Sequence, residues 1–191
     1  MAAHAAAALQ ELCHALQLLA AGAKVTALDV SAPRLDRLEE NLTRCGMHAE
    51  TVVADALDWA PEAPFDAILL DAPCSATGTI RRHPDLTFVK GASGIKELVA
   101  LQAALLDRAL GWLKPGGRLV YATCSLLPEE GEAQITAALT RHPGLKITPI
   151  TAPGLDPDWL TDSGCLRLRP DFWSERGGLD GFFVAVLQQG G

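Results

Sequence analysis

The sequence lacks the features by which metal-binding, disulfide-stabilised and secreted proteins are usually recognised. It contains five cysteines among 191 residues, and no two of them are spaced as CxxC. An odd number of scattered cysteines predicts reduced thiols and no metal site, as is typical of cytosolic proteins. The stretch from Met1 to Ala23 is apolar, but it has no basic leader and is interrupted by polar residues. We therefore expect a cytoplasmic protein without a membrane segment.

Basic residues are also fewer than acidic ones, and the formal net charge is -7. A protein that holds nucleic acid mainly through phosphate contacts is usually basic. Any contact with RNA is therefore expected to be local, or to come from a domain outside this sequence. The length and the 49% content of hydrophobic residues suit one α/β domain.

Predicted strands and helices alternate along the chain, a pattern that favours parallel βα units. Strands are expected at residues 23–29, 49–55, 65–71, 118–125, 145–150 and 180–187. Helices are expected from Ser31 to Gly46, from about Lys96 to Leu113 and from Pro128 to His142. The predicted fold class is α/β, with a doubly wound, mostly parallel sheet.

Acids and thiols gather at the ends of these predicted strands. Asp29, Asp55 and Asp71 each end a strand, and Cys74 and Cys124 follow strand ends. Because the carboxyl ends of parallel strands share one edge of a sheet, where ligands of open α/β sheets bind, we expect these residues to border one crevice. Taken singly, Asp29 could cap the following turn, Asp55 could be a solvated loop residue, and the cysteines could be small buried hydrophobes.

The residue types suggest specific chemistry at this edge. Asp29 is placed to accept hydrogen bonds from ribose hydroxyls, and Asp55 to contact an adenine amino group. The thiols of Cys74 and Cys124 suit conjugate addition to an electron-poor ring or acyl transfer. Acyl transfer would need a histidine as base, and His83 alone is expected near this edge, so a Cys–His enzyme is the weaker alternative.

Two motifs closely resemble those of the Sun family of RNA cytosine-C5 methyltransferases, particularly the bacterial small-subunit ribosomal RNA enzymes. They are DAPCSATG, followed by RRHPD, and YATCS, which follows KPGGRL. The resemblance covers roughly residues 23–187 and implies S-adenosylmethionine as cofactor, RNA (16S ribosomal RNA above all) as substrate, and 5-methylcytosine as product. It implies that Cys124 is the nucleophile and that Cys74 assists release of the product.

The same resemblance assigns further roles in a catalytic domain at residues 23–191. Asp29 and Asp55 would hold the cofactor, and Asp71 would lie close to both the cofactor and the target base, where it assists catalysis. Arg81 and Arg82 are candidate RNA phosphate contacts, with a solvated loop as the plainer interpretation. The roles of Arg167 and Arg169, in the stretch LRLRPDFW, are not separable from surface solubility.

The beginning of the chain departs from the family pattern. The family starts this domain with a strand and a glycine-rich loop similar to DLCAAPGGKT, whereas ELCHALQLLAAGA stands here. We therefore predict that residues 1–22 form an atypical alanine-rich helical segment and that the usual first strand is lacking. The loop that would cradle the methionine end of the cofactor, and the RNA-binding N-terminal domain of the ribosomal enzymes, are expected to be missing.

Two other functions belong to different classes. In the first, the chain is an inactive or truncated methyltransferase-like domain that only binds RNA or a protein partner. The altered loop and the net acidity favour this alternative. A nicotinamide-dependent oxidoreductase is disfavoured, because no GxGxxG precedes Asp29.

Overall fold

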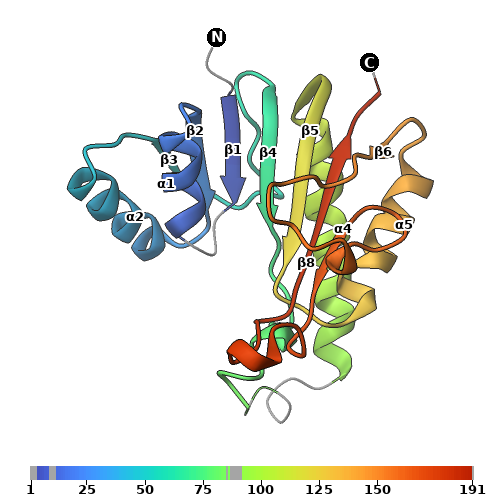
Figure 1. Ribbon diagram of the computed structural model, residues 1–191. Coiled ribbons are helices and arrows are strands. Elements are labelled where there is room, and N and C mark those ends of the chain that lie inside the picture. Colours follow the sequence, from blue (N-terminus) through green and yellow to red (C-terminus); the bar gives the residue numbers. More distant parts are fainter. Residues whose placement is uncertain (1–3, 9–11, 85, 87–91, 191) are drawn as a thin grey trace.

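A central mixed sheet organises the protein (Figure 1). A computed structural model describes residues 4–8, 12–84, 86 and 92–190. The strands are β1 (His4–Ala8), β2 (Lys24–Asp29), β3 (Glu50–Val53), β4 (Phe65–Asp71), β5 (Leu113–Thr123), β6 (Lys146–Ile147), β7 (Leu166–Leu168) and β8 (Phe182–Gln188). Their order is β3-β2-β1-β4-β5-β8-β6, and β7 pairs with β8. Strands β1 to β5 are parallel to one another, whereas β8 runs antiparallel to β5.

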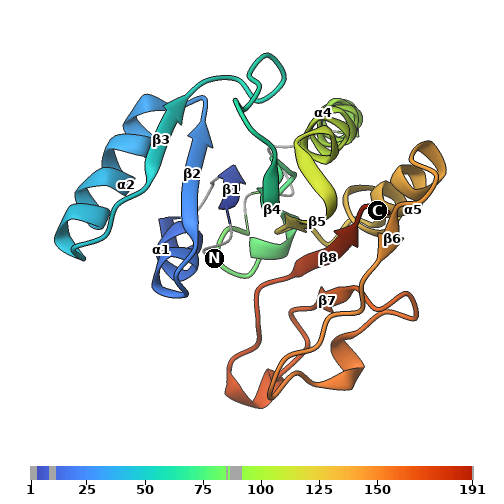
Figure 2. The ribbon, with the colours of Figure 1, turned by 90° about the horizontal axis from the view of Figure 1, so that it is seen from above.

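Helices cover both faces of the sheet, which confirms the predicted doubly wound α/β fold. They are α1 (Leu12–Ala20), α2 (Ala32–Arg44), α4 (Ala92–Gly111) and α5 (Glu132–Arg141). Figure 2 shows α1 and α2 on one face and α4 and α5 on the other. In the described part of the chain, no helix is long and apolar enough to cross a membrane.

Each face of the sheet has its own hydrophobic core. On the first face, Leu35, Leu38 and Leu42 recur at helical spacing along α2 and are buried in a cluster with residues of β2. On the second face, Leu106 of α4 and Phe183 of β8 are fully buried in one cluster with β4, β5 and α5. The two cores explain why β4, which lies at the centre of the sheet, is a nearly continuous apolar run.

The prediction that the first strand is lacking was wrong. Strand β1 lies between β2 and β4 and is parallel to both, with Ala7 opposite Ala27 and Leu69. Alanine favours helices in isolation, but a segment that pairs with a strand on each side satisfies its backbone there, and this tertiary pairing outweighs the local preference. The helical prediction holds only for α1. Residues 9–11, where the resemblance implies a glycine-rich loop, lie outside the described residues.

The predicted helix after Pro128 is divided in two. A short 3-10 turn, η2 (Pro128–Glu130), precedes α5, and Gly131 between them has φ -129° and ψ -102°. A Cβ on Gly131 would lie 2.4 Å from the Arg167 guanidinium and 3.0 Å from the Phe183 ring. The break therefore lets the chain pass close under β8 before α5 begins.

Gly78 joins the loop after β4 to the ends of β5 and β8. Its N–H donates to the Cys124 carbonyl at 2.9 Å, and its carbonyl accepts from the Gly181 N–H at 2.8 Å. A Cβ built at this position would lie 2.0 Å from the Gly181 carbonyl oxygen. Only glycine lets these three backbone segments approach so closely.

Replacing this glycine should therefore destabilise the protein. Gly78→Ala is expected to lower the free energy of unfolding by about 1–3 kcal/mol, because backbone on both sides must move. Gly94→Ala is the matched control, since a Cβ there meets nothing within 4 Å and lies in α4. Urea unfolding of both variants measures the difference, and equal stability of the two would contradict the close approach.

Candidate active site

The two cysteines that follow β4 and β5 meet at the carboxyl edge of the sheet. Asp71 pairs with Ala122 in the β4–β5 ladder, so Cys74 and Cys124 leave adjacent strands at nearly the same level. Their sulfur atoms lie 3.5 Å apart. The Cys74 side chain is buried, and that of Cys124 is partly exposed. The expected convergence of the two thiols is thus present in the structure.

The contact between the thiols shifts their pKa values in opposite directions. A hydrogen bond from the Cys124 thiol lowers the pKa of Cys74, although burial opposes this effect. The same hydrogen bond raises the pKa of Cys124, as do burial and the negative charges of Cys74 and Asp71. The pair therefore loses a first proton readily and a second only with difficulty. A thiolate in contact with a thiol can act as its base, because the proton moves along an existing hydrogen bond.

A buried carboxylate holds the loops that carry both cysteines. Glu130, at the end of η2, is fully buried. Its oxygens accept hydrogen bonds from the Ser75 N–H at 2.8 Å, from the Ser125 hydroxyl at 2.5 Å and from the Ser75 hydroxyl. Ser75 follows Cys74, and Ser125 follows Cys124. One side chain therefore fixes the residue after each thiol.

Further buried polar groups complete this network. The Gln102 side chain of α4 donates to the Glu130 carboxylate at 3.0 Å and to the Pro73 carbonyl at 2.9 Å. The Tyr121 hydroxyl and the Thr123 hydroxyl both donate to the Glu130 carbonyl, at 3.0 and 3.2 Å. The carboxylate therefore has charge-assisted donors that offset the cost of its burial.

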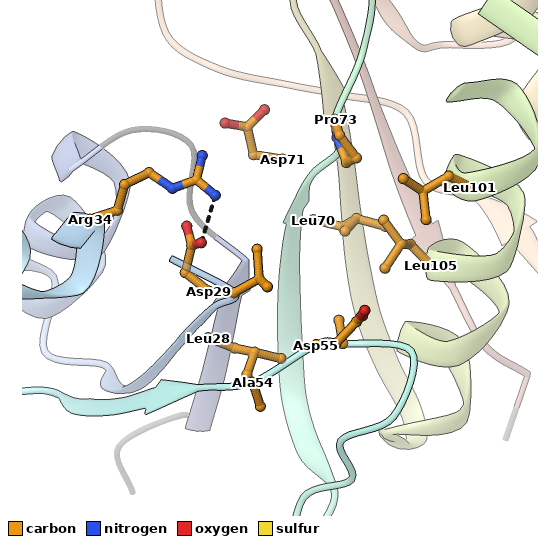
Figure 3. Close-up of a pocket in the computed structure, with 12 residues that line it drawn as sticks. Leu28, Asp29, Arg34, Ala54, Asp55, Leu70, Asp71, Pro73, Leu101 and Leu105 are labelled. Atoms are coloured by element: carbon orange, nitrogen blue, oxygen red, sulfur yellow. Dashed lines mark hydrogen bonds and ion pairs between the residues drawn. The ribbon is translucent and has the colours of Figure 1, made fainter. Parts of the chain in front are cut away.

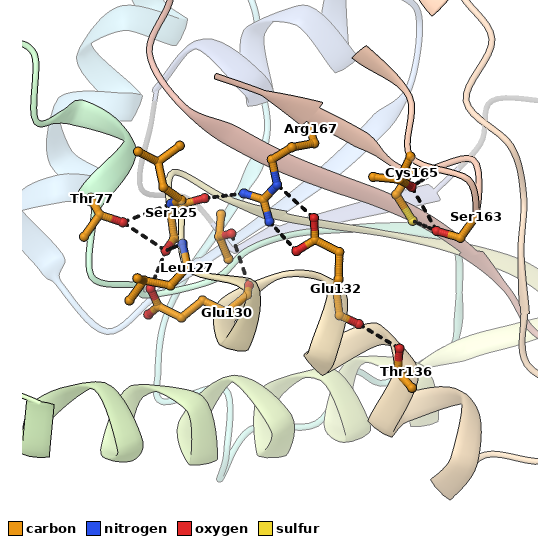
Figure 4. Close-up of polar contacts among 12 residues, drawn as sticks. Thr77, Ser125, Leu127, Glu130, Glu132, Thr136, Ser163, Cys165 and Arg167 are labelled. Atoms are coloured by element: carbon orange, nitrogen blue, oxygen red, sulfur yellow. Dashed lines mark hydrogen bonds and ion pairs between the residues drawn. The ribbon is translucent and has the colours of Figure 1, made fainter. Parts of the chain in front are cut away.

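The chain after Cys124 is held from its other side by Thr77 and Arg167 (Figure 4). The Thr77 hydroxyl accepts from the Leu126 N–H at 2.9 Å, and the Arg167 guanidinium donates to the Ser125 carbonyl at 2.6 Å. Arg167 also makes a two-bond ion pair with Glu132 and lies over the Phe183 ring. The structure thus gives Arg167 a structural role that its sequence context did not reveal.

A cavity of about 270 Å³ lies at the ends of β2 and β4 (Figure 3). All three predicted aspartates line it. Apolar walls face them, contributed by Leu28, Leu70, Pro73, Leu101 and Leu105. Cys74 and Cys124 are not among the residues that line the cavity. The prediction that acids and thiols border one crevice is therefore corrected: the acids line a cavity, and the thiol pair follows its lining residues Asp71 and Pro73 along the chain.

The aspartates differ in their surroundings. Asp29 is buried, and one of its oxygens accepts from Arg34 at 2.6 Å and from the Ser31 N–H at 2.7 Å. The bond from Ser31 is the turn-capping contact that was the plainer interpretation of Asp29. Asp55 is exposed, as its plainer interpretation as a solvated loop residue predicts, and accepts from the Leu57 N–H at 2.8 Å. Neither contact uses both oxygens of a carboxylate, so each acid retains acceptor capacity toward the cavity.

The two predicted RNA contacts lie on the loop after β4. Arg82 makes an ion pair with Asp180 at 2.7 Å, and Arg81 lies 3.9 Å from the same carboxylate. The side chains of Arg81 and Arg82 remain about half exposed, at 49% and 52% respectively. Asp180 immediately precedes Gly181, so this pair of arginines also ties its loop to the start of β8.

Glu130 and Gln102 were not identified from the sequence. The stretch PEEGE lies at the start of the helix predicted from Pro128 to His142, and nothing in the residue types marks one of its acids as buried. The glycine after Glu130 was the available signal, because it interrupts the helical pattern where η2 ends.

Comparison with known proteins assigns the chain to a family. The family model described as 16S rRNA methyltransferase RsmB/F matches residues 4–188. The chain belongs to this family. The match starts at the first residue of β1, which agrees with the presence of that strand in the sheet.

Curated relatives carry the name ribosomal RNA small subunit methyltransferase B. The protein from Shewanella oneidensis is 42% identical over 180 residues, which cover 92% of this chain and 39% of the relative. The protein from Erwinia tasmaniensis is 48% identical over 171 residues, which cover 86% of this chain and 36% of the relative. This chain therefore spans about two fifths of the length of these RsmB/F relatives.

Two solved structures from Pyrococcus horikoshii share the fold. A methyltransferase homolog protein is 31% identical, with a TM-score of 0.78 over 98% of this chain and 62% of its own. NSun6, solved with SFG, is 28% identical, with a TM-score of 0.77 over 98% of this chain and 48% of its own.

The two arginines of LRLRPDFW should now be separable by mutation. Arg167→Met removes the donor to the Ser125 carbonyl and should lower the free energy of unfolding by about 1.5–3 kcal/mol. Arg169→Met breaks an exposed pair with Asp171 and should leave the unfolding midpoint unchanged. Urea denaturation of both variants tests this, and the assignment fails if Arg169→Met is the more damaging change.

Proposed function

We propose that the chain is the catalytic part of an RNA (cytosine-C5) methyltransferase that uses S-adenosylmethionine and acts on 16S ribosomal RNA. The contact between Cys74 and Cys124, beside a cavity lined by acids, is the observation that carries this proposal. Membership of the RsmB/F family supports the ribosomal RNA substrate. A ribosomal substrate also implies a cytoplasmic enzyme.

The cavity fits the adenosine part of S-adenosylmethionine. Asp29 lies at the end of β2, where a carboxylate suits ribose hydroxyls, and Asp55 lies on the next strand's loop, where it suits the adenine amino group. The apolar side chains of Leu28, Leu70 and Leu105 offer flat contact to a ring. When bound, the cofactor supplies an electrophilic methyl group to the activated base.

The thiol pair supplies the activation that cytosine needs. Carbon 5 of cytosine is a weak nucleophile, and addition of a thiolate to carbon 6 turns the ring into an enamine-like nucleophile. As the Cys124 sulfur bonds to carbon 6, its proton passes to the Cys74 thiolate along the 3.5 Å contact. When protonated, Asp71 would donate a hydrogen bond at the pyrimidine edge and so stabilise the negative charge that develops on the ring.

Release of the product reverses this addition. After the Cys74 thiol has passed the proton of Cys124 to solvent, its thiolate takes the proton from carbon 5. The bond between carbon 6 and sulfur then breaks, Cys124 leaves as a thiolate, and the ring regains its aromatic character. Cys74 assists this step from the position that it holds beside Cys124. The target base must be unpaired or flipped out to reach the pair, which suits a loop of folded RNA.

Local positive charge at the edge of the site would contact the RNA. Arg81 and Arg82 are half exposed on the loop that also carries Cys74, so phosphates on either side of the target base lie within their reach. Their partner Asp180 would exchange its ion pairs for phosphate contacts on binding, which limits the gain in affinity.

The two cysteines should have separable effects on a covalent complex with RNA. Cys124→Ala is expected to abolish methyl transfer and any covalent complex, because the bond to carbon 6 cannot form. Cys74→Ala should form a covalent complex more slowly, because the Cys124 proton must then pass to solvent, but should let that complex accumulate, because release is impaired. Denaturing gel electrophoresis of each variant with unmodified 16S ribosomal RNA and S-adenosylmethionine measures both.

Cys165→Ala serves as the control, because Cys165 is buried away from the pair in the second hydrophobic core. Methylation of RNA by Cys124→Ala would disprove the assignment of the nucleophile. Cofactor and RNA binding without methyl transfer by the unchanged chain would favour the alternative of a binding module.

Substitutions of Asp29 and Asp71 should affect different quantities, the affinity for the cofactor and the turnover rate respectively. Asp29→Ala is expected to weaken S-adenosylmethionine binding by about 1.5–3 kcal/mol, through loss of hydrogen bonds to a charged acceptor. Asp71→Ala should reduce turnover with a smaller loss of affinity. Isothermal titration with S-adenosylmethionine gives the affinities, and equal losses in both variants would contradict this division.

A further inference from the structure

Cys74 and Cys124 lie beyond the ladder of backbone hydrogen bonds between β4 and β5, because β4 ends at Asp71 and β5 at Thr123. The last pairing along these strands is between Asp71 and Ala122, and the Ala72 N–H then donates to the Ala122 carbonyl at 2.9 Å. Beyond this point, the two loops are joined by one backbone hydrogen bond, from the Gly78 N–H to the Cys124 carbonyl at 2.9 Å, and otherwise by side chains. Thr77 bonds directly to the second loop through the Leu126 N–H, whereas Glu130 binds the residue that follows each cysteine.

We propose that Glu130 is the positioning residue of the thiol pair, and that its carboxylate keeps the Cys74 and Cys124 sulfur atoms within contact. The proposal rests on the proposed function only where it says what the contact between the sulfur atoms is for. Its geometry is independent of any reaction. Glu130 touches neither sulfur and acts through Ser75 and Ser125, the residues that follow the two cysteines.

A carboxylate suits this position better than any neutral side chain. Ser75 offers two donors, Ser125 one and Gln102 one, and all of them are directed at the two carboxylate oxygens. A glutamine in its place would offer one acceptor oxygen and would bring an NH₂ group against these donors. At least one loop would then lose its hydrogen bonds to the position, and the two sulfur atoms would separate.

The negative charge of Glu130 and its positioning of the sulfur atoms affect the pKa of Cys74 in opposite directions. The direction in which that pKa moves when Glu130 is replaced therefore tests the proposal. Its charge raises the pKa of Cys74, whereas the hydrogen bond from Cys124 lowers it and is the largest influence. If Glu130 acted only through its charge, its removal would make the Cys74 thiol more acidic. If Glu130 positions the pair, its removal breaks the sulfur contact and makes the same thiol less acidic.

The pH dependence of thiol alkylation in Glu130→Gln distinguishes these outcomes. The unchanged chain and the variant would be treated with iodoacetamide across a range of pH, and the modification of each cysteine followed by peptide mass spectrometry. We expect the midpoint for Cys74 to move upward by about one pH unit, a tenfold loss of thiolate near neutral pH. The midpoint is the decisive quantity, because a change in access alters the rate at every pH and leaves the midpoint in place.

Glu129→Gln is the matched control, because Glu129 is the adjacent residue, carries the same charge and is exposed. The exposed thiol of Cys45 is the internal reference in every sample. A midpoint that falls or stays constant in a folded Glu130→Gln protein would overturn the proposal. An equal rise in Glu129→Gln would do so as well.

Ser75→Ala and Ser125→Ala keep the proposal testable if Glu130→Gln does not fold, as judged by circular dichroism. Each removes one hydroxyl and retains the carboxylate, so each should raise the same midpoint by a smaller amount. Unchanged midpoints in both folded serine variants would overturn the proposal. Because alkylation requires neither RNA nor cofactor, this result is independent of whether the chain methylates RNA.

Discussion

The hydrogen bonds to the buried carboxylate of Glu130 are the constraint on which the rest of the site depends. They come from loops that follow two different strands and from helix α4. The parallel sheet brings Cys74 and Cys124 to one edge, but a sheet specifies positions only as far as its ladder extends. Past the last pair, Glu130 converts proximity into contact between the sulfur atoms, at the cost of a buried charge that four donors must offset.

Glycines make this arrangement sterically possible. Gly131 lets the backbone turn from η2 into α5 directly beneath Arg167 and Phe183, and so places Glu130 in the interior. Gly78 lets the loop of Cys74 lie against the backbone of Cys124 and Gly181. The site is therefore built from backbone contacts that tolerate no Cβ, with polar side chains filling the remaining space. Such a site is rigid, which suits a reaction that requires a nucleophile and a base in fixed contact.

The sequence predicted those features that depend on strand periodicity and on the geometry of parallel sheets. Strands β2 and β4 were predicted nearly to the residue, because apolar runs end at Asp29 and Asp71. The meeting of Cys74 with Cys124 followed from the rule that parallel strands end at one edge. Strand β1 was missed because alanine carries no strand preference, and its identity comes from the partners on either side. Glu130 was missed because burial of one acid among several is decided by tertiary structure, which the local pattern does not encode.

The proposed reaction makes Cys124, rather than Cys74, the residue that becomes bonded to RNA. Mapping the bond is its most direct test. The chain would be incubated with S-adenosylmethionine and a 16S ribosomal RNA transcript in which 5-fluorocytidine replaces cytidine. Because fluorine cannot leave carbon 5 as a proton does, the adduct should persist through digestion and peptide mass spectrometry. The account predicts a nucleotide adduct on the peptide at Cys124; an adduct on Cys74, or none on either cysteine, would contradict it.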